Sequence, residues 1–335
     1  MVSTAKPPID PARWNAPPVD PLPELPRAEL TLVPVPGGEP EDVVVDADGN
    51  LWVGARDGGI VRLAPDGTAP EVIANTGGRP LGLAFAHDGR LLVCDSPRGL
   101  LALDTTTGAI ETLVTSIGGR PLRFCSNVTQ TDDGTIYFTE STSAFTIDHY
   151  VAAILEARGR GALHRLEPDG TVTTLVDGLY FANGVTPTAD GSALVFAETQ
   201  GRRLSKYWLT GPKAGSVTSL VANLPAMPDN LSTGPDGRIW CAMVTAANAV
   251  ADRFAGWAPV LRKVVWALPP RLQPKPTAVV WAVAFDPDSG EAVSGLKMTH
   301  PTFSMVTGLV EVGHRLWLGS IGGPHLGWVY LPTTL

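Results

Sequence analysis

The chain has 335 residues, including 36 Gly and 31 Pro, and only 17% of its residues are charged. This composition is typical of a loop-rich, β-rich protein, and a formal net charge of −8 argues against a nucleic-acid-binding surface. No segment reaches the ~18 apolar residues of a membrane-spanning helix and no export signal is recognised, so we expect a cytoplasmic protein. The three cysteines, Cys94, Cys125 and Cys241, are widely spaced and odd in number, which predicts small core residues.

The first part of the chain, residues 1–28, contains eight proline residues and predicts an extended arm without regular structure. An apolar strand follows at residues 30–33, with no neighbouring segment to pair with it. The domain proper is expected to span residues 29–335.

A repeat then begins, in which an Asp-Gly turn joins two apolar strands. Asp-Gly between apolar runs is a strong hairpin signal. Most copies continue into a second hairpin, so each unit contains four strands. The five turns are Asp48-Gly49, Asp88-Gly89, Asp133-Gly134, Asp190-Gly191 and Asp236-Gly237.

The spacing of the units predicts a β-propeller. Equivalent positions at the start of the first strand are separated by 40, 45, 57, 46 and 77 residues, against the ~40–50 of a propeller blade. The sixth unit has no Asp-Gly turn, so its position rests on the strand residue Trp317, with strands expected near 307–312, 315–319 and 326–331. We therefore predict an all-β, six-bladed propeller of four-stranded blades, closed by the N-terminal strand at 30–33.

Two insertions, at about 143–160 and 246–276, have helical periodicity and are predicted to form short helical lids over the channel mouth. In the first, Asp148 is expected to cap a helix that runs to Ala157. In the second, Pro259 is expected to divide the segment from Asp252 to Leu268 into two helices.

The aligned positions also predict a metal site. First strands line the channel of a propeller, so residues at their starts converge on its axis. Glutamate, aspartate and asparagine oxygens suit Ca²⁺; Mg²⁺ and Mn²⁺ fit less well, and Zn²⁺ is disfavoured without His or Cys ligands. On the third blade either Ser126 or its neighbour Asn127 supplies the oxygen. The aligned residues are Glu41, Leu81, Ser126, Asn183, Asp229 and Val306.

Several motifs resemble one family, the calcium-dependent six-bladed propellers that include regucalcin, the gluconolactonases and the phosphotriesterases, and within it the strictosidine-synthase-like branch. They include Phe124-Cys125-Ser126-Asn127, Leu179-Tyr180-Phe181-Ala182-Asn183-Gly184 and Pro228-Asp229-Asn230. The resemblance implies a catalytic Ca²⁺ held by Glu41, Asn183 and Asp229. Condensing members carry a catalytic Glu on the last blade where this chain has Thr307, which argues against condensation of an amine with an aldehyde.

A Ca²⁺-dependent hydrolase of a lactone, ester or phosphotriester is the predicted function, with the ion polarising the carbonyl group and Asp229 acting as base or nucleophile. The substrate is expected to be a small molecule. Two alternatives stay open: a condensing enzyme, and a non-catalytic propeller with a structural ion that binds a partner or a membrane through its lid. The residues expected to line the pocket are Phe124, Phe181, Thr307 and His300.

Overall fold

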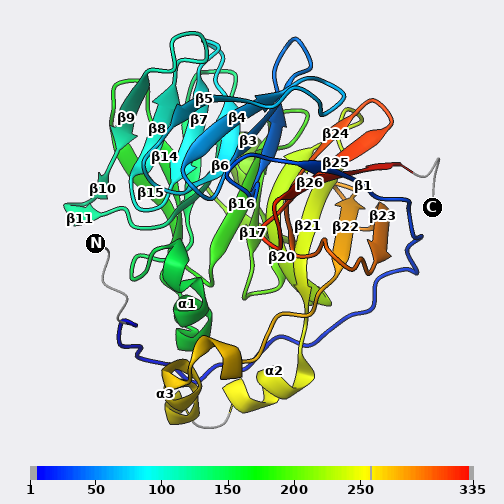
Figure 1. Cartoon of the computed structure of the whole chain (residues 1–335). Coiled ribbons are helices and arrows are strands. Elements are labelled where there is room, and N and C mark those ends of the chain that lie inside the picture. The colour runs from blue at the N-terminus through cyan, green and yellow to red at the C-terminus, as the bar shows by residue number, and fades with distance from the viewer. Residues whose placement is uncertain (1–5, 257–258, 332–335) are drawn as a thin grey trace.

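The structure is a computed structural model that describes residues 6–256 and 259–331. Six four-stranded antiparallel sheets surround one axis, with the lid helices at one end of the ring (Figure 1). The predicted six-bladed propeller is therefore confirmed. The inner strand of each blade lies beside the inner strands of its neighbours, and this places the starts of six strands around one central channel.

The first three blades follow one another along the chain. Blade 1 contains β2 (Val43–Val45), β3 (Leu51–Gly54), β4 (Gly59–Leu63) and β5 (Glu71–Asn75). Blade 2 contains β6 (Pro80–Phe85), β7 (Leu91–Asp95), β8 (Gly99–Leu103) and β9 (Ile110–Val114). A small hairpin of β10 (Ser116–Ile117) and β11 (Arg120–Pro121) precedes blade 3, which contains β12 (Cys125–Gln130), β13 (Ile136–Glu140), β14 (Gly161–Leu166) and β15 (Val172–Leu179).

The last three blades complete the ring. Blade 4 contains β16 (Ala182–Pro187), β17 (Ala193–Glu198), β18 (Arg203–Trp208) and β19 (Val217–Val221), with a 3-10 turn η2 (Gly211–Lys213). Blade 5 contains β20 (Ala226–Thr233), β21 (Ile239–Ala246), β22 (Val280–Phe285) and β23 (Ala292–Met298). Blade 6 contains β24 (Val306–Val312), β25 (Arg315–Ser320), β26 (His325–Tyr330) and β1 (Thr31–Pro34).

Closure of the ring depends on β1, which pairs antiparallel with β26 from Thr31 opposite Trp328 to Pro34 opposite His325. The early strand therefore supplies the outer strand of the last blade, as predicted, one residue later than expected. This pairing joins the two ends of the chain and leaves blade 6 with a full set of four strands.

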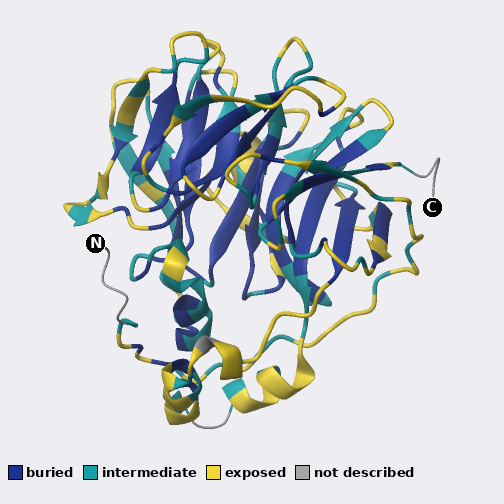
Figure 2. Ribbon diagram, viewed as in Figure 1, coloured by how far each residue is buried: buried dark blue, intermediate teal, exposed yellow. Residues whose placement is uncertain are grey.

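The core lies between neighbouring blades and consists of buried aliphatic and aromatic side chains. Figure 2 shows that most of the blade strands are buried. The cluster between blades 2 and 3, for example, combines Leu92 and Cys94 with Val128 and Phe138. All three cysteines are buried and unbridged, which confirms them as core residues. The structure adds that the Sγ atoms of Cys94 and Cys125 face each other across this boundary at 2.8 Å.

The lid insertions form helices at one end of the ring. The first contains η1 (Ile147–His149) and α1 (Tyr150–Glu156). The predicted cap at Asp148 is wrong, because His149 precedes α1 and makes no side-chain cap, while Ala157 ends the helix in a left-handed conformation. The second contains α2 (Ala249–Ala255), α3 (Pro259–Ala267) and η3 (Pro270–Leu272), so the predicted division at Pro259 is confirmed.

The N-terminal arm has no helix or strand between residue 6 and β1, and it runs across the lid before it reaches the ring (Figure 1). The buried guanidinium groups of Arg202 and Arg262 fix it, since they donate to the carbonyl oxygens of Pro17 and Ala12. The indole Nε1 of Trp266 on α3 donates to the carbonyl oxygen of Pro7 at 2.7 Å. Arm and lid therefore form one packed layer. None of the helices in the described residues combines the length and apolar character needed to cross a membrane.

Candidate active site

A β-bulge at the start of the inner strand brings the candidate residues to the channel. In blades 2 to 6 two consecutive residues of the inner strand lie opposite a single residue of the neighbouring strand. These two residues leave the regular ladder of pairs, and the register shifts by one residue. Bulges of this kind redirect a side chain out of the sheet. The displaced pairs are Leu81-Gly82, Ser126-Asn127, Asn183-Gly184, Asp229-Asn230 and Thr307-Gly308.

These bulges correct one sequence alignment. Val306 pairs with Ser320 just as Ala182 pairs with Glu198 and Cys125 with Glu140, so Val306 precedes the bulge. The residue of blade 6 that matches Asn183 and Ser126 is therefore Thr307, one position later than predicted from Trp317. The alignment failed because β24 and β25 are joined by the two-residue turn Gly313-His314, which is shorter than the Asp-Gly turns of the other blades.

The six equivalent residues meet at a cavity of about 270 Å³ on the axis, under the lid. One residue comes from each blade, and α1, α2, α3 and the segment after η3 contribute the roof. The structure therefore brings together side chains that are separated by up to 266 positions in the sequence. The six residues are Glu41, Leu81, Ser126, Asn183, Asp229 and Thr307.

Asn183 connects three of the polar groups. Its Nδ2 donates to Asp229 Oδ1 at 2.7 Å and to Thr199 Oγ1 at 3.1 Å, while its Oδ1 accepts from Ser126 Oγ at 3.0 Å. Ser141 Oγ donates to Ser126 Oγ at 2.9 Å and so helps to orient the Ser126 hydroxyl. This network fixes the direction of the Asp229 carboxylate, and one of its oxygens receives the Asn183 bond.

Glu41 lies on the other side of the same cavity and is nearly fully buried. The amide Nδ2 of Asn230 is 3.3 Å from both of its carboxylate oxygens, and Thr307 Oγ1 donates to its main-chain oxygen at 2.6 Å. Burial raises the pKa of Glu41 well above its usual value, and the negative charge of Asp229 raises it further. The guanidinium of Arg79 opposes this increase.

Asp229 has a similar environment. Burial raises its pKa from 3.8 to about 8, although the hydrogen bond from Asn183 acts in the opposite direction. Two buried carboxylates that face one cavity and repel each other favour a cation between them. The donor set fits a hard cation such as Ca²⁺: two carboxylates, the amide of Asn183 and the hydroxyl of Ser126. Within the described residues, no group of three or more His, Cys, Asp or Glu side chains is arranged to hold a metal ion. A cation at this site would therefore also need the amide oxygen of Asn183 and the hydroxyl oxygen of Ser126.

Asp42 is a buried carboxylate that the sequence prediction missed. Its two oxygens accept main-chain hydrogen bonds from Val43 at 2.9 Å and Leu83 at 3.0 Å, which ties blade 1 to blade 2. Burial raises its pKa to about 7, and its charge also raises the pKa of Asp229. Asp42 does not line the cavity, so it acts on the site through structure and charge.

Asn127 is the equivalent of Asp42 on blade 3. Its Oδ1 accepts from the main-chain N–H of Val185 at 3.1 Å, which ties blade 3 to blade 4, and its side chain is absent from the cavity wall. Of the two blade-3 candidates, Ser126 therefore faces the cavity. One sequence signal distinguishes these positions: the second residue of each pair alternates between polar and Gly, as Asp42, Gly82, Asn127, Gly184, Asn230 and Gly308.

The pocket residues proposed from the sequence divide into two groups. Phe124, Phe181 and Thr307 line the cavity, and the two phenylalanine rings pack edge to face with centroids 5.5 Å apart. His300 does not line it; its Nδ1 accepts from the main-chain N–H of Thr302 at 3.3 Å in a loop before β24. The lid adds an apolar wall that the sequence could not place, including Val151, Ile154, Leu155 and Val265.

Comparison with known proteins now identifies the family. The family model described as strictosidine synthase matches residues 127–212, and the model described as strictosidine synthase-like, N-terminal, matches residues 25–63. Strictosidine synthase-like protein 6 of Arabidopsis thaliana is 32% identical over 303 residues, covering 86% of this chain and 77% of that protein. The chain belongs to the strictosidine synthase-like family. The resemblance expected from the sequence motifs is thereby confirmed.

Solved structures extend the likeness to the propeller fold. A gluconolactonase from Xanthomonas campestris superposes with a TM-score of 0.64 at 19% identity, covering 99% of each chain. A calcium-binding regucalcin from Agrobacterium tumefaciens superposes with a TM-score of 0.60 at 15% identity, covering 90% of this chain and 92% of that one. At these identities the strictosidine synthase-like chain shares the fold of these proteins.

Proposed function

We propose that this strictosidine synthase-like protein is a Ca²⁺-dependent hydrolase of an apolar lactone or ester. The observation that carries the proposal is the pair of buried carboxylates, Glu41 and Asp229, which line one cavity on the axis and repel each other. Buried charges of one sign are unfavourable unless a counter-charge is supplied. The gluconolactonase and calcium-binding regucalcin among the structural neighbours support the same chemistry.

Glu41, Asn183 and Asp229 would hold the ion, with Ser126 as a further oxygen donor. When bound, Ca²⁺ supplies positive charge that polarises the substrate carbonyl group and stabilises the oxyanion that forms on it. The second proposed role belongs to Asp229, either as general base toward water or as nucleophile. Asn183 donates to Asp229 Oδ1, which supports this role because the other carboxylate oxygen receives no bond from Asn183.

The cavity wall selects the class of substrate. Leu81, Phe124 and Phe181 form its lower part, and the apolar faces of α1 and α3 close it from above. A wall of this kind gains free energy by burying the apolar surface of a ligand, which a free sugar does not supply. An alkyl or aryl lactone or ester fits it better than a sugar lactone.

Condensation of an amine with an aldehyde is not favoured by this site. Thr307 occupies the last-blade position that lines the cavity, and its hydroxyl donates to the main-chain oxygen of Glu41. A threonine hydroxyl is a hydrogen-bonding group that does not ionise near neutral pH, so it cannot replace a carboxylate as general base. The reaction expected here therefore uses the acidic groups of blades 1 and 5.

The test is hydrolysis of a panel of alkyl lactones, aryl esters and phosphotriesters by the purified chain, before and after treatment with a chelator. We expect turnover of apolar lactones or esters that disappears with the chelator and returns with added Ca²⁺. Calorimetric titration with Ca²⁺ alone supplies a readout that does not depend on activity. Ca²⁺ binding without turnover of any substrate would favour a structural ion, and neither binding nor turnover would refute the proposal.

A further inference from the structure

The outer face of the lid presents apolar side chains to solvent. Val260 and Val264 on α3 are 60% and 57% exposed, Val250 on α2 is 63% exposed, and Leu272 at the end of η3 is 66% exposed. Figure 1 shows α2 and α3 at the end of the molecule, away from the ring, and Figure 2 shows that much of both helices is exposed. We call the surface formed by Val250, Val260, Leu261, Val264 and Leu272 the lid face.

Helix α3 is apolar on both sides, although only one side is covered by protein. On its inner side Val265 lines the cavity, and Trp266 is buried against the N-terminal arm. On its outer side Val260, Leu261 and Val264 are exposed at one-turn spacing. A lid helix that faces only water normally has a polar outer side, and a helix that is apolar all round is normally covered. We therefore expect another surface to cover the lid face when the protein functions.

The charge around the lid face indicates what covers it. Residues 246–277 contain five Lys or Arg and a single acidic residue, Asp252, within a chain of net charge −8. Asp252 is already paired with Arg202 at 2.6 Å. Lys263 and Arg271 are exposed and directly precede Val264 and Leu272 in the sequence, and Lys275 is exposed at the edge of the cavity that it also lines. A basic surface with exposed valine and leucine complements an anionic lipid bilayer, in which apolar side chains enter the acyl boundary and basic groups reach the phosphates.

A second copy of the chain fits this surface less well. A symmetric dimer through the lid face would place the same basic residues opposite each other, because both partners contribute one patch. Like charges in such an interface repel and reduce affinity. An anionic bilayer satisfies both the apolar and the basic side chains.

We propose that the lid face docks the protein on anionic lipid membranes. Docking would place the roof of the cavity at the bilayer surface, because α2 and α3 supply both the lid face and part of the cavity wall. An apolar ligand dissolved in the bilayer would then reach the cavity without crossing water. The inference concerns binding alone and holds whether or not the cavity hydrolyses its ligand.

The experiment is co-sedimentation of the full chain with vesicles of phosphatidylcholine alone or mixed with phosphatidylserine. We expect partitioning to be at least about tenfold stronger on the anionic vesicles and to weaken with added salt. The double variant Val260→Asp, Val264→Asp should lose about a hundredfold, because it removes two apolar contacts. Val217→Asp on β19 is the matched control: Val217 is 45% exposed but distant from the lid, and its variant should bind like the unmodified chain.

A second pair of variants separates charge from apolar contact. Lys263→Glu with Lys275→Glu should reduce binding to the anionic vesicles by about tenfold or more and leave binding to neutral vesicles unchanged. Unchanged circular dichroism would show that each variant is folded. Equal binding of the Val260→Asp, Val264→Asp variant and the control, or no binding to anionic vesicles, would overturn the proposal. A dimer that dissociates in the same variant would instead identify a second copy as the occupant and would also overturn it.

Discussion

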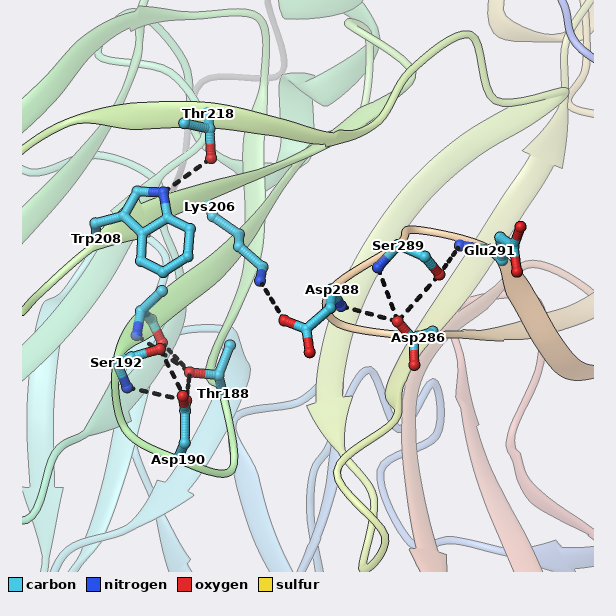
Figure 3. A network of polar contacts seen from close by, with 11 residues as sticks. Thr188, Asp190, Ser192, Lys206, Trp208, Thr218, Asp286, Asp288, Ser289 and Glu291 are labelled. Carbon is cyan, nitrogen blue, oxygen red and sulfur yellow. Dashed lines mark hydrogen bonds and ion pairs between the residues drawn. The ribbon is translucent and has the colours of Figure 1, made fainter. Parts of the chain in front are cut away.

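The two ends of the propeller use aspartate in opposite ways. At the end with the Asp-Gly turns, Asp190 Oδ1 accepts from Thr188 Oγ1 at 2.6 Å and from Ser192 N at 3.0 Å (Figure 3). These bonds, led by the one from Thr188, lower the pKa of Asp190 to about 2. At the channel end, burial raises the pKa of Asp229 to about 8. The same residue type stabilises a turn in its ionised form at one end, whereas burial disfavours its ionised form at the other.

The contrast shows that the volume of a cavity does not by itself identify the functional site. The end with the Asp-Gly turns has the larger hollow, about 800 Å³ between blades 3 and 4, and its wall includes Asp190 and Thr188. The carboxylate of Asp190 is already satisfied by its own turn, as is that of Asp286, whose Oδ1 accepts from Ser289 N at 2.8 Å (Figure 3). The smaller channel cavity holds the buried carboxylates that can still gain from a ligand.

The largest expected difference between the ends is catalytic. Asp229→Asn should lower kcat/KM for the lactone or ester identified by the panel by about 10³-fold, because the amide can neither accept a proton nor attack a carbonyl group. Asp190→Asn is the matched control and should keep full activity. Steady-state kinetics with excess Ca²⁺ provide the measurement. Full activity of Asp229→Asn would exclude both proposed roles of this residue.

Packing at the two ends should also differ in its tolerance of one added methyl group. A Cβ on Gly184 would lie 2.4 Å from the main-chain nitrogen of Leu231 and 2.6 Å from Asn230 Cα, so the backbone must shift. Gly184→Ala should therefore reduce the free energy of unfolding by about 3 kcal/mol.

The control is Gly191 of an Asp-Gly turn, which has space around it but a φ of +66°. Gly191→Ala should cost about 1 kcal/mol, through backbone strain alone. Urea denaturation measures both variants. An equal cost at the two positions would contradict the close packing of the inner ring.

Features that are encoded within a few residues could be predicted from the sequence, whereas features that depend on contacts between blades could not. Asp-Gly turns and apolar strands are encoded within a few residues, so the blades, the ring closure and five of the six channel positions could be read from the sequence. The channel residue of blade 6 is Thr307, one position after the predicted Val306, because the turn Gly313-His314 is shorter than the turns of the other blades. The role of Asp42 depends on a hydrogen bond to Leu83 of the next blade, which no local pattern reports.

The pH dependence of stability should have opposite signs at the two ends. Asp229 has a raised pKa in the folded protein, so its contribution is fully present below pH 3.8 and is lost as the pH rises toward 8. In chelator, the melting temperature should therefore fall between pH 5 and pH 8, by roughly 5 °C. Saturating Ca²⁺ should restore about 3 kcal/mol at pH 8, because it binds the folded, ionised site.

Differential scanning calorimetry across this range, with and without Ca²⁺, makes the measurement. The Asp229→Asn variant is the control, since it removes one of the titrating groups and should flatten the decline. A melting temperature that rises with pH in chelator would contradict the environment assigned to the channel carboxylates.

The smallest effect is expected at the Asp-Gly end, where solvent reaches the carboxylates. Asp190→Asn replaces an ionised acceptor with a neutral one but keeps an oxygen for Thr188 and Ser192, so it should cost less than about 1 kcal/mol. Because the pKa of Asp190 is lowered, its contribution is present above pH 3.8 and is lost as the pH falls toward 2. Urea denaturation at pH 7 and at pH 3 should show the variant closer to the unmodified chain at the lower pH. A larger cost at pH 3 than at pH 7 would mean that the turn does not depend on the ionised carboxylate, and the contrast between the two ends would then rest on burial alone.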